Sequence, residues 1–166
     1  MLVSALGVAL SLAFTGEASA QTPFQATVSA TQTLPAGPCA NGAFFCGTAN
    51  LAGYGSESWN FFVTSSTPVP SSCGSSYTAT TEFTLAGDPG STLVLDESGA
   101  LCAPGKDGAA FFKEGSKAYG HPFTIVGSWS VDPTSTGQFA ALAGSGTDLV
   151  KTAGARAAGS YTGTLG

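Results

Sequence analysis

The sequence predicts an all-β fold, a small antiparallel meander barrel of about 7–8 strands. Helix is disfavoured because Gly, Ser and Thr are abundant, only 9% of residues are charged, and no segment after residue 20 sustains a helical repeat of helix-forming residues. Apolar and polar residues alternate instead with a period of two, which places one set of side chains on each face of a strand. Such strands could also form a β-sandwich, but closure removes exposed strand edges and therefore favours the barrel.

Residues 1–20 have the pattern of a secretory signal peptide. The apolar run over residues 2–14 is too short to span a bilayer, and the small residues 18–20 form a typical cleavage pattern. No Lys or Arg precedes the run, so the leader is atypical or its start lies a few codons upstream. A buried N-terminal helix is the alternative interpretation. Residues 21–166 have the length of a single domain, and we expect this domain to be secreted and to contain no transmembrane segment.

Seven segments of this domain carry the strand pattern, and alternation is clearest in Phe24–Thr31. Turn-rich segments such as 86–90 and 132–137 separate them. An eighth strand could lie within 108–119. The other six predicted strands are 47–63, 77–86, 91–97, 123–132, 138–148 and 159–165.

Five glycines interrupt the predicted strands. A missing side chain permits the sharp coiling that a small barrel needs, so these positions favour closure. They are Gly53, Gly55, Gly127, Gly144 and Gly146.

The C-terminal region carries a resemblance to a known family. The pattern STGQFAALAGSGT at 135–147 and YTGTL at 161–165 resembles the closing strands of allene-oxide-cyclase-like and dirigent-like barrels, particularly secreted bacterial relatives, over about a fifth of the chain. The resemblance implies an eight-stranded antiparallel barrel whose lumen could hold an apolar small molecule. It implies no catalytic residue, because no catalytic motif of the family matches a position here.

The four cysteines predict two disulfides in an exported protein. In a seven-strand meander, successive connections alternate between the two ends of the barrel. Cys39 and Cys46 then share one end and Cys73 and Cys102 the other, which favours the pairing Cys39–Cys46 with Cys73–Cys102. A zinc site is disfavoured because there is no C-x-x-C pair and only one histidine. No phosphate-loop or dinucleotide motif is present, so no metal or cofactor is expected.

All five basic residues lie in the last 61 positions, and the seven-strand arrangement gathers them at one end of the barrel. Such a rim on an acidic body could steer an anionic ligand toward the lumen, although solvated loop lysines are the alternative. So few bases argue against nucleic-acid binding. An eighth strand within 98–122 would divide the rim. The five bases are Lys106, Lys113, Lys117, Lys151 and Arg156, of which Lys113 and Lys117 are the candidate ligand contacts.

Glu57 is the first candidate catalytic residue. It shares the odd-numbered apolar set of strand 47–63 with Trp59, so it is expected to point inward. Burial would raise its pKa into the range useful for general acid or base catalysis. A bulge at the glycines would instead turn it to solvent. His121, the sole histidine, is the second candidate because its pKa of about 6.5 suits proton transfer, but a surface histidine in a loop is the alternative.

Inward-facing aromatic residues form the candidate ligand wall, or the core if the lumen is filled. They are Trp59, Phe61, Tyr77, Phe83, Trp129 and Tyr161. We expect a secreted barrel that binds an apolar or anionic small molecule. A cyclase- or isomerase-like enzyme that uses Glu57 as acid or base is the first alternative, and an extracellular surface or adhesion module is the second.

Overall fold

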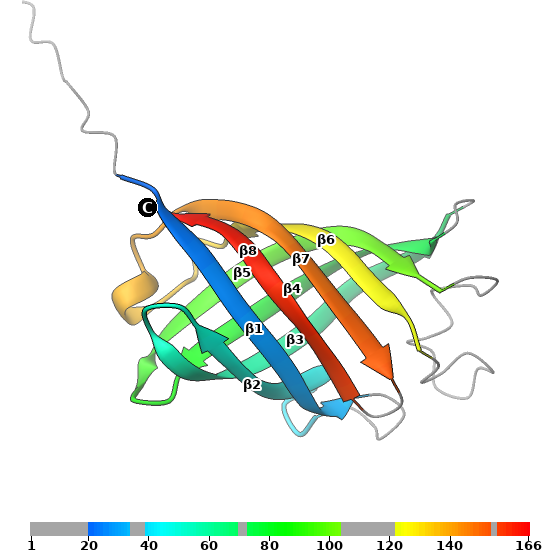
Figure 1. The fold of residues 1–166 in the computed structure, drawn as a ribbon, viewed down its shortest axis with the longest axis horizontal. Helices are drawn as coiled ribbons and strands as arrows, with labels where there is room; N and C mark the ends of the chain where they lie inside the picture. Colours follow the sequence, from blue (N-terminus) through cyan, green and yellow to red (C-terminus); the bar gives the residue numbers. More distant parts are fainter. Residues whose placement is uncertain (1–19, 34–38, 70–72, 104–121, 154–155) are drawn as a thin grey trace, which may run out of the picture.

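Eight antiparallel strands form a closed barrel in the computed structural model, which describes residues 20–33, 39–69, 73–103, 122–153 and 156–166 (Figure 1). Each strand pairs with the next along the chain, and the last pairs with the first. The predicted meander barrel is confirmed, and the sandwich is excluded. The strands are β1 (Thr22–Thr33), β2 (Phe45–Leu51), β3 (Gly55–Pro68), β4 (Gly74–Leu85), β5 (Asp88–Cys102), β6 (Thr124–Val131), β7 (Gly144–Ala153) and β8 (Arg156–Leu165).

The predicted strand 47–63 is wrong, because this segment forms a hairpin of two strands. Gly53 and Gly55 have φ of +89° and +95°, the left-handed backbone that favours glycine, and the chain reverses between Leu51 and Gly55. These glycines therefore make a turn and do not coil a continuous strand. The eighth strand arises here, while the candidate segment 108–119 lies outside the described residues.

The predicted strand 138–148 begins six residues late, as β7 at Gly144. A short 3-10 helix, η2 (Gly137–Phe139), precedes it and packs against β5. Gly137 has a φ of +59°, and a Cβ there would lie 2.7 Å from the Ser91 Cα. The first half of the predicted strand is therefore a short helix and a turn, and only its second half is strand.

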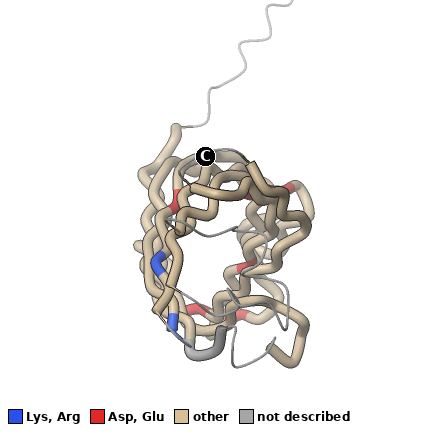
Figure 2. Tube along the Cα trace, turned by 90° about the vertical axis from the view of Figure 1, so that its right-hand side faces the viewer, with Lys and Arg blue, Asp and Glu red and all other residues tan. Residues whose placement is uncertain are grey.

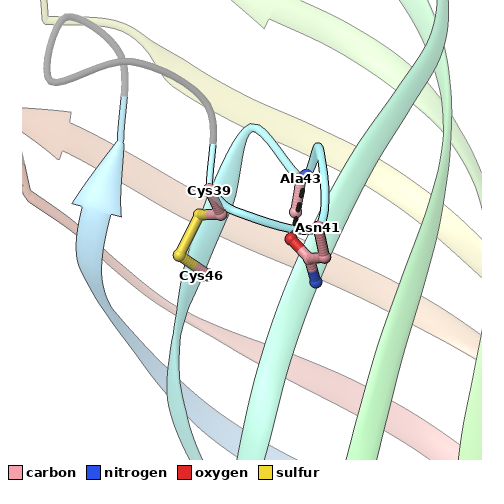
Figure 3. The surroundings of a disulfide bond; sticks show 4 residues. All are labelled: Cys39, Asn41, Ala43 and Cys46. Carbon is pink, nitrogen blue, oxygen red and sulfur yellow. Dashed lines mark hydrogen bonds between the residues drawn. A yellow bond between two sulfur atoms is a disulfide. The ribbon is translucent and has the colours of Figure 1, made fainter.

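Both predicted disulfides are present, but at one end of the barrel. The extra hairpin places the β1–β2, β3–β4, β5–β6 and β7–β8 connections together, and we call this the disulfide end. The Cys39–Cys46 bridge joins the segment before β2 to the start of that strand. Between the two cysteines, the Asn41 side chain accepts a hydrogen bond from the Ala43 amide at 3.1 Å (Figure 3). The second bridge, Cys73–Cys102, joins β4 to β5. The pairing is confirmed, whereas the expected separation to opposite ends is wrong.

Large aromatic side chains from opposite walls fill much of the interior. Tyr161 on β8 meets Phe83 on β4 edge to face, with ring centroids 5.3 Å apart, although three strands lie between β4 and β8 in either direction around the barrel. Phe45 and Phe61 stack at 5.2 Å. An eight-stranded barrel has an interior just wide enough for such side chains or one small ligand. Within the described residues, no helix is long and apolar enough to cross a membrane.

Candidate functional site in the barrel lumen

Two carboxylic acids, Glu97 and Asp148, face the interior, and each is only 3% exposed. Glu97 continues the buried odd-numbered set of β5, after Leu93 and Leu95. Asp148 alternates in the same way with Val150 on β7. The period of two therefore obliges both acids to enter the lumen, because turning either outward would expose its apolar neighbours.

Two glycines make the space in which Asp148 meets Tyr77. Strand register sets Tyr77 beside Gly99, Gly99 beside Gly127, and Gly127 beside Asp148. No side chain stands between the tyrosine and the acid, so the Tyr77 hydroxyl donates to Asp148 Oδ2 at 3.5 Å. A Cβ on Gly127 would collide with both the Tyr77 Oη and the Asp148 Oδ1. A larger residue at this position would displace the tyrosine and the acid from their present contact, so the close approach favours glycine.

A second tyrosine completes the group. Tyr161 is the β8 neighbour of Asp148 in the register, and its hydroxyl lies 3.4 Å from the Thr81 Oγ1 across the lumen. Either hydroxyl can be the donor in this contact, so the pair can form a hydrogen bond with a donor group or an acceptor group of another molecule. We call these five residues the acid–tyrosine cluster: Tyr77, Thr81, Glu97, Asp148 and Tyr161.

Burial changes the protonation of the two acids. Burial, together with the nearby charge of Asp148, raises the pKa of Glu97 to about 8, although the hydroxyls of Thr81, Tyr161 and Tyr77 partly oppose the rise. Burial raises the pKa of Asp148 to about 6, opposed by the hydrogen bond from Tyr77. At neutral pH the pair therefore holds one proton, mainly on Glu97, and one negative charge, mainly on Asp148. The pKa of each tyrosine is raised as well, first by burial and then by these acids, so both keep their hydroxyl protons.

Three carboxyl oxygen atoms of the cluster have no hydrogen-bond partner among the described residues. They are both carboxyl oxygens of Glu97 and the Asp148 Oδ1, all fully buried. The hydroxyls near Glu97 are close enough to influence its pKa, but none meets the geometry of a hydrogen bond to it. Because an unpaired buried polar atom costs about 1–3 kcal/mol, these oxygens are suited to receive donors from a bound molecule or from ordered water.

Glu57 also faces the interior and is 2% exposed, as the apolar set of its strand predicts. Burial raises its pKa to about 7, and neither of its oxygens has a hydrogen-bond partner within the described chain. It lies near the start of β3, at the end opposite the disulfides. The hydroxyls of Tyr77 and Tyr161 contact Asp148 and Thr81 and do not bond to Glu57. Its catalytic role stays a prediction.

The structure brings the predicted aromatic wall together but leaves the predicted rim largely undescribed. Trp59, Phe61, Tyr77, Phe83, Trp129 and Tyr161 are all buried in the barrel. His121, Lys106, Lys113 and Lys117 lie outside the described residues. Lys151 and Arg156 are exposed at the disulfide end, and Figure 2 shows the described bases together on one side of the barrel wall, with acids distributed around it.

Sequence reasoning missed Glu97 and Asp148. A usable signal existed for Glu97, because Leu93, Leu95 and Leu101 share its odd-numbered phase once the strand is extended past residue 97. The signal for Asp148 was weaker. The inward and outward positions of the predicted strand 138–148 were assigned from its first residues, which do not form a strand.

Concave surfaces of the described chain lie on the outer wall and at one end of the barrel. A groove of about 520 Å³ crosses the outer face of β5, β6 and β7, and a hollow of about 390 Å³ lies at the end of the barrel opposite the disulfides. The groove is lined largely by hydroxyl groups, including those of Ser98, Ser128 and Thr147. No group of three or more His, Cys, Asp or Glu is arranged to hold a metal within the described ranges.

Comparison with protein-family models, with curated proteins and with solved structures returned no match. The barrel and the acid–tyrosine cluster therefore carry the functional argument.

Proposed function

We propose that this chain is an exported β-barrel that binds a small, largely apolar molecule in its lumen. The observation that carries the proposal is the set of buried oxygens of Glu97 and Asp148 that have no partner in the described protein. A stable core normally pairs such atoms, and binding sites are where unpaired polar groups converge inside an apolar wall. The aromatic side chains around them supply that wall.

Two features support export. Both disulfides belong to a class of bond that persists in oxidising compartments, and residues 1–20 have the pattern of a signal peptide. The resemblance to secreted allene-oxide-cyclase-like and dirigent-like barrels agrees with this proposal. An anionic group on the ligand would be placed at the exposed bases Lys151 and Arg156, because the charged side chains of the described lumen are all acids.

The test uses 2-naphthol as a neutral aromatic probe. Binding at a concentration of 100 Kd stabilises the fold by about 2.7 kcal/mol, which raises Tm by roughly 5–10 °C, and it should change the fluorescence of the buried Trp59 and Trp129. Tyr161→Phe should weaken binding, while Thr162→Val, on the outer face of the same strand, should not. An unchanged Tm and unchanged fluorescence at saturating probe would refute the proposal.

A second function is favoured by the unequal protonation of the acid pair. A protonated Glu97 beside an ionised Asp148 provides a general acid and a general base at neutral pH. This arrangement suits a proton-transfer enzyme such as an isomerase or cyclase, with Tyr161 positioned to hydrogen-bond a carbonyl oxygen. Deuterium exchange at the α-carbons of cyclohexanone in D₂O measures this activity. Asp148→Asn should lower a genuine exchange rate by about 100-fold or more, and an unchanged rate would exclude the role.

A further inference from the structure

The described barrel interior contains acidic side chains and no basic ones. Glu57, Glu97 and Asp148 are buried, whereas Lys151 and Arg156, the described bases, are exposed. The strands around the cluster contribute only hydroxyl, aromatic and aliphatic side chains beside these acids: Tyr77 and Thr81 from β4, Trp129 from β6, Tyr161 from β8, Phe24 and Ala26 from β1 and Trp59 from β3. The described protein therefore supplies no internal positive charge to balance the lumen.

The unbalanced charge sits mainly on Asp148. Among the described residues, the one side-chain donor to it from another residue is the Tyr77 hydroxyl, at the long distance of 3.5 Å. A buried carboxylate without a cation is costly, typically by several kcal/mol. A bound cation would offset this cost through its attraction to the carboxylates, whereas a bound anion would increase it.

The unpaired atoms match the hydrogen-bonding capacity of an ammonium group. Such a group has three N–H donors and no acceptor. With Glu97 ionised, the cluster presents three buried acceptor atoms without partners among the described residues, the two oxygens of Glu97 and the Asp148 Oδ1. A guanidinium or a neutral alcohol matches this set less well, because the first has five donors and the second only one.

Aromatic rings lie beside the carboxyl groups of the cluster. Trp129 is the β6 neighbour of Glu97 in the register, and its ring lies 5.1 Å from that of Phe24. Tyr161, a member of the cluster, forms a second aromatic pair with Phe83. Ring faces attract cations, and this attraction grows when water is excluded, so they favour both the charge and an apolar body.

We propose that the lumen ligand is a primary amine, bound as an ammonium group between Glu97 and Asp148 with its apolar part against the aromatic wall. The inference rests on the proposed function and names the chemical class of its ligand. Binding transfers the Glu97 proton to solvent, since the ammonium charge favours ionised carboxylates on both sides. Proton release on binding is therefore part of the proposal.

The test compares three probes of one shape: 2-phenylethylamine, 2-phenylethanol and phenylacetate. Isothermal titration calorimetry at pH 7, in two buffers of different ionisation enthalpy, measures affinity and proton release. We expect the amine to bind at least about ten-fold more tightly than the alcohol, with phenylacetate weakest, and to release a proton. In Glu97→Gln and Asp148→Asn the amine should lose this advantage, while Glu82→Gln, which removes a carboxylate from the outer side of β4, should retain it.

The possible failures separate the two proposals. Equal affinities for amine and alcohol, or tightest binding of phenylacetate, would overturn the amine inference and leave lumen binding intact. Binding of none of the three probes would count against both. Amine preference that survives both Glu97→Gln and Asp148→Asn would place the amine elsewhere and also overturn the inference. Near-ultraviolet circular dichroism of each variant shows that the aromatic core is folded.

Discussion

Glu97 should make the fold less stable as the pH rises. Its pKa of about 8 in the folded protein exceeds the ordinary 4.5, so the folded state holds the proton more tightly than the unfolded state does. The stabilisation is complete below pH 4.5 and is lost as the pH rises to 8 and beyond. Asp148 acts in the same direction over a lower range, up to about pH 6, because its pKa is raised from 3.8.

The size of the effect follows from the two pKa values of Glu97. At about 1.4 kcal/mol per pH unit, the interval from 4.5 to about 8 sets an upper limit of roughly 5 kcal/mol. Structural relaxation and water penetration reduce this, and we expect a loss of about 3 kcal/mol between pH 5 and pH 9. Glu97→Gln keeps the shape and stays neutral, so it should change stability by less than about 1 kcal/mol at pH 5 and stabilise the fold by about 3 kcal/mol at pH 9.

Urea denaturation followed by tryptophan fluorescence, with both disulfides oxidised, measures this at pH 5, 7 and 9. Trp59 and Trp129 are buried, so unfolding exposes both reporters. Glu82→Gln is the matched control and should keep the pH dependence of the wild type. The reasoning is refuted if Glu97→Gln shows the same fall in stability from pH 5 to pH 9 as the wild type, or is the less stable of the two at pH 9.

Three further predictions concern the close contact at Gly127, the disulfides and Glu57. Gly127→Ala should destabilise the fold by about 1–3 kcal/mol in urea, because the new methyl group displaces the cluster side chains it would touch. Removing Cys73–Cys102 as a serine pair should cost roughly 3.5 kcal/mol by chain entropy, since it spans 29 residues. Glu57→Gln should abolish a fluorescence change of Trp59 that titrates near pH 7 in the wild type.

Each of these has a control on the same chain. Gly87→Ala should be nearly neutral, because a Cβ at Gly87 meets nothing within 4 Å, and an equal loss in both glycine variants would contradict the close-approach argument. The Cys39–Cys46 serine pair should cost less, roughly 2.5 kcal/mol, because the bridge spans 7 residues. A larger cost there would show that local packing and not chain entropy dominates. A pH-dependent fluorescence signal that survives Glu57→Gln would assign the titration to another group.

Strand number shows where sequence reasoning reached its limit for the fold. The segment 47–63 has one uninterrupted odd-numbered apolar set, and a continuous strand and a tight hairpin share that pattern across Gly53 and Gly55. Only the backbone φ of the two glycines distinguishes them. The disulfide pairing was nevertheless correct, because moving the first connection to the other end leaves each cysteine close to its partner.

The sequence by itself determined the all-β class, the closed meander, the disulfide pairing and the inward direction of Glu57 with its aromatic neighbours. These properties depend on local alternation and on short separations along the chain. The tertiary structure alone decided that Glu97 and Asp148 share one site with Tyr77 and Tyr161. That meeting depends on the register of β4 to β8 and on Gly99 and Gly127 standing between the polar side chains. Register is set by pairing between distant segments, whereas a period of two reports only which side of its own strand each residue faces.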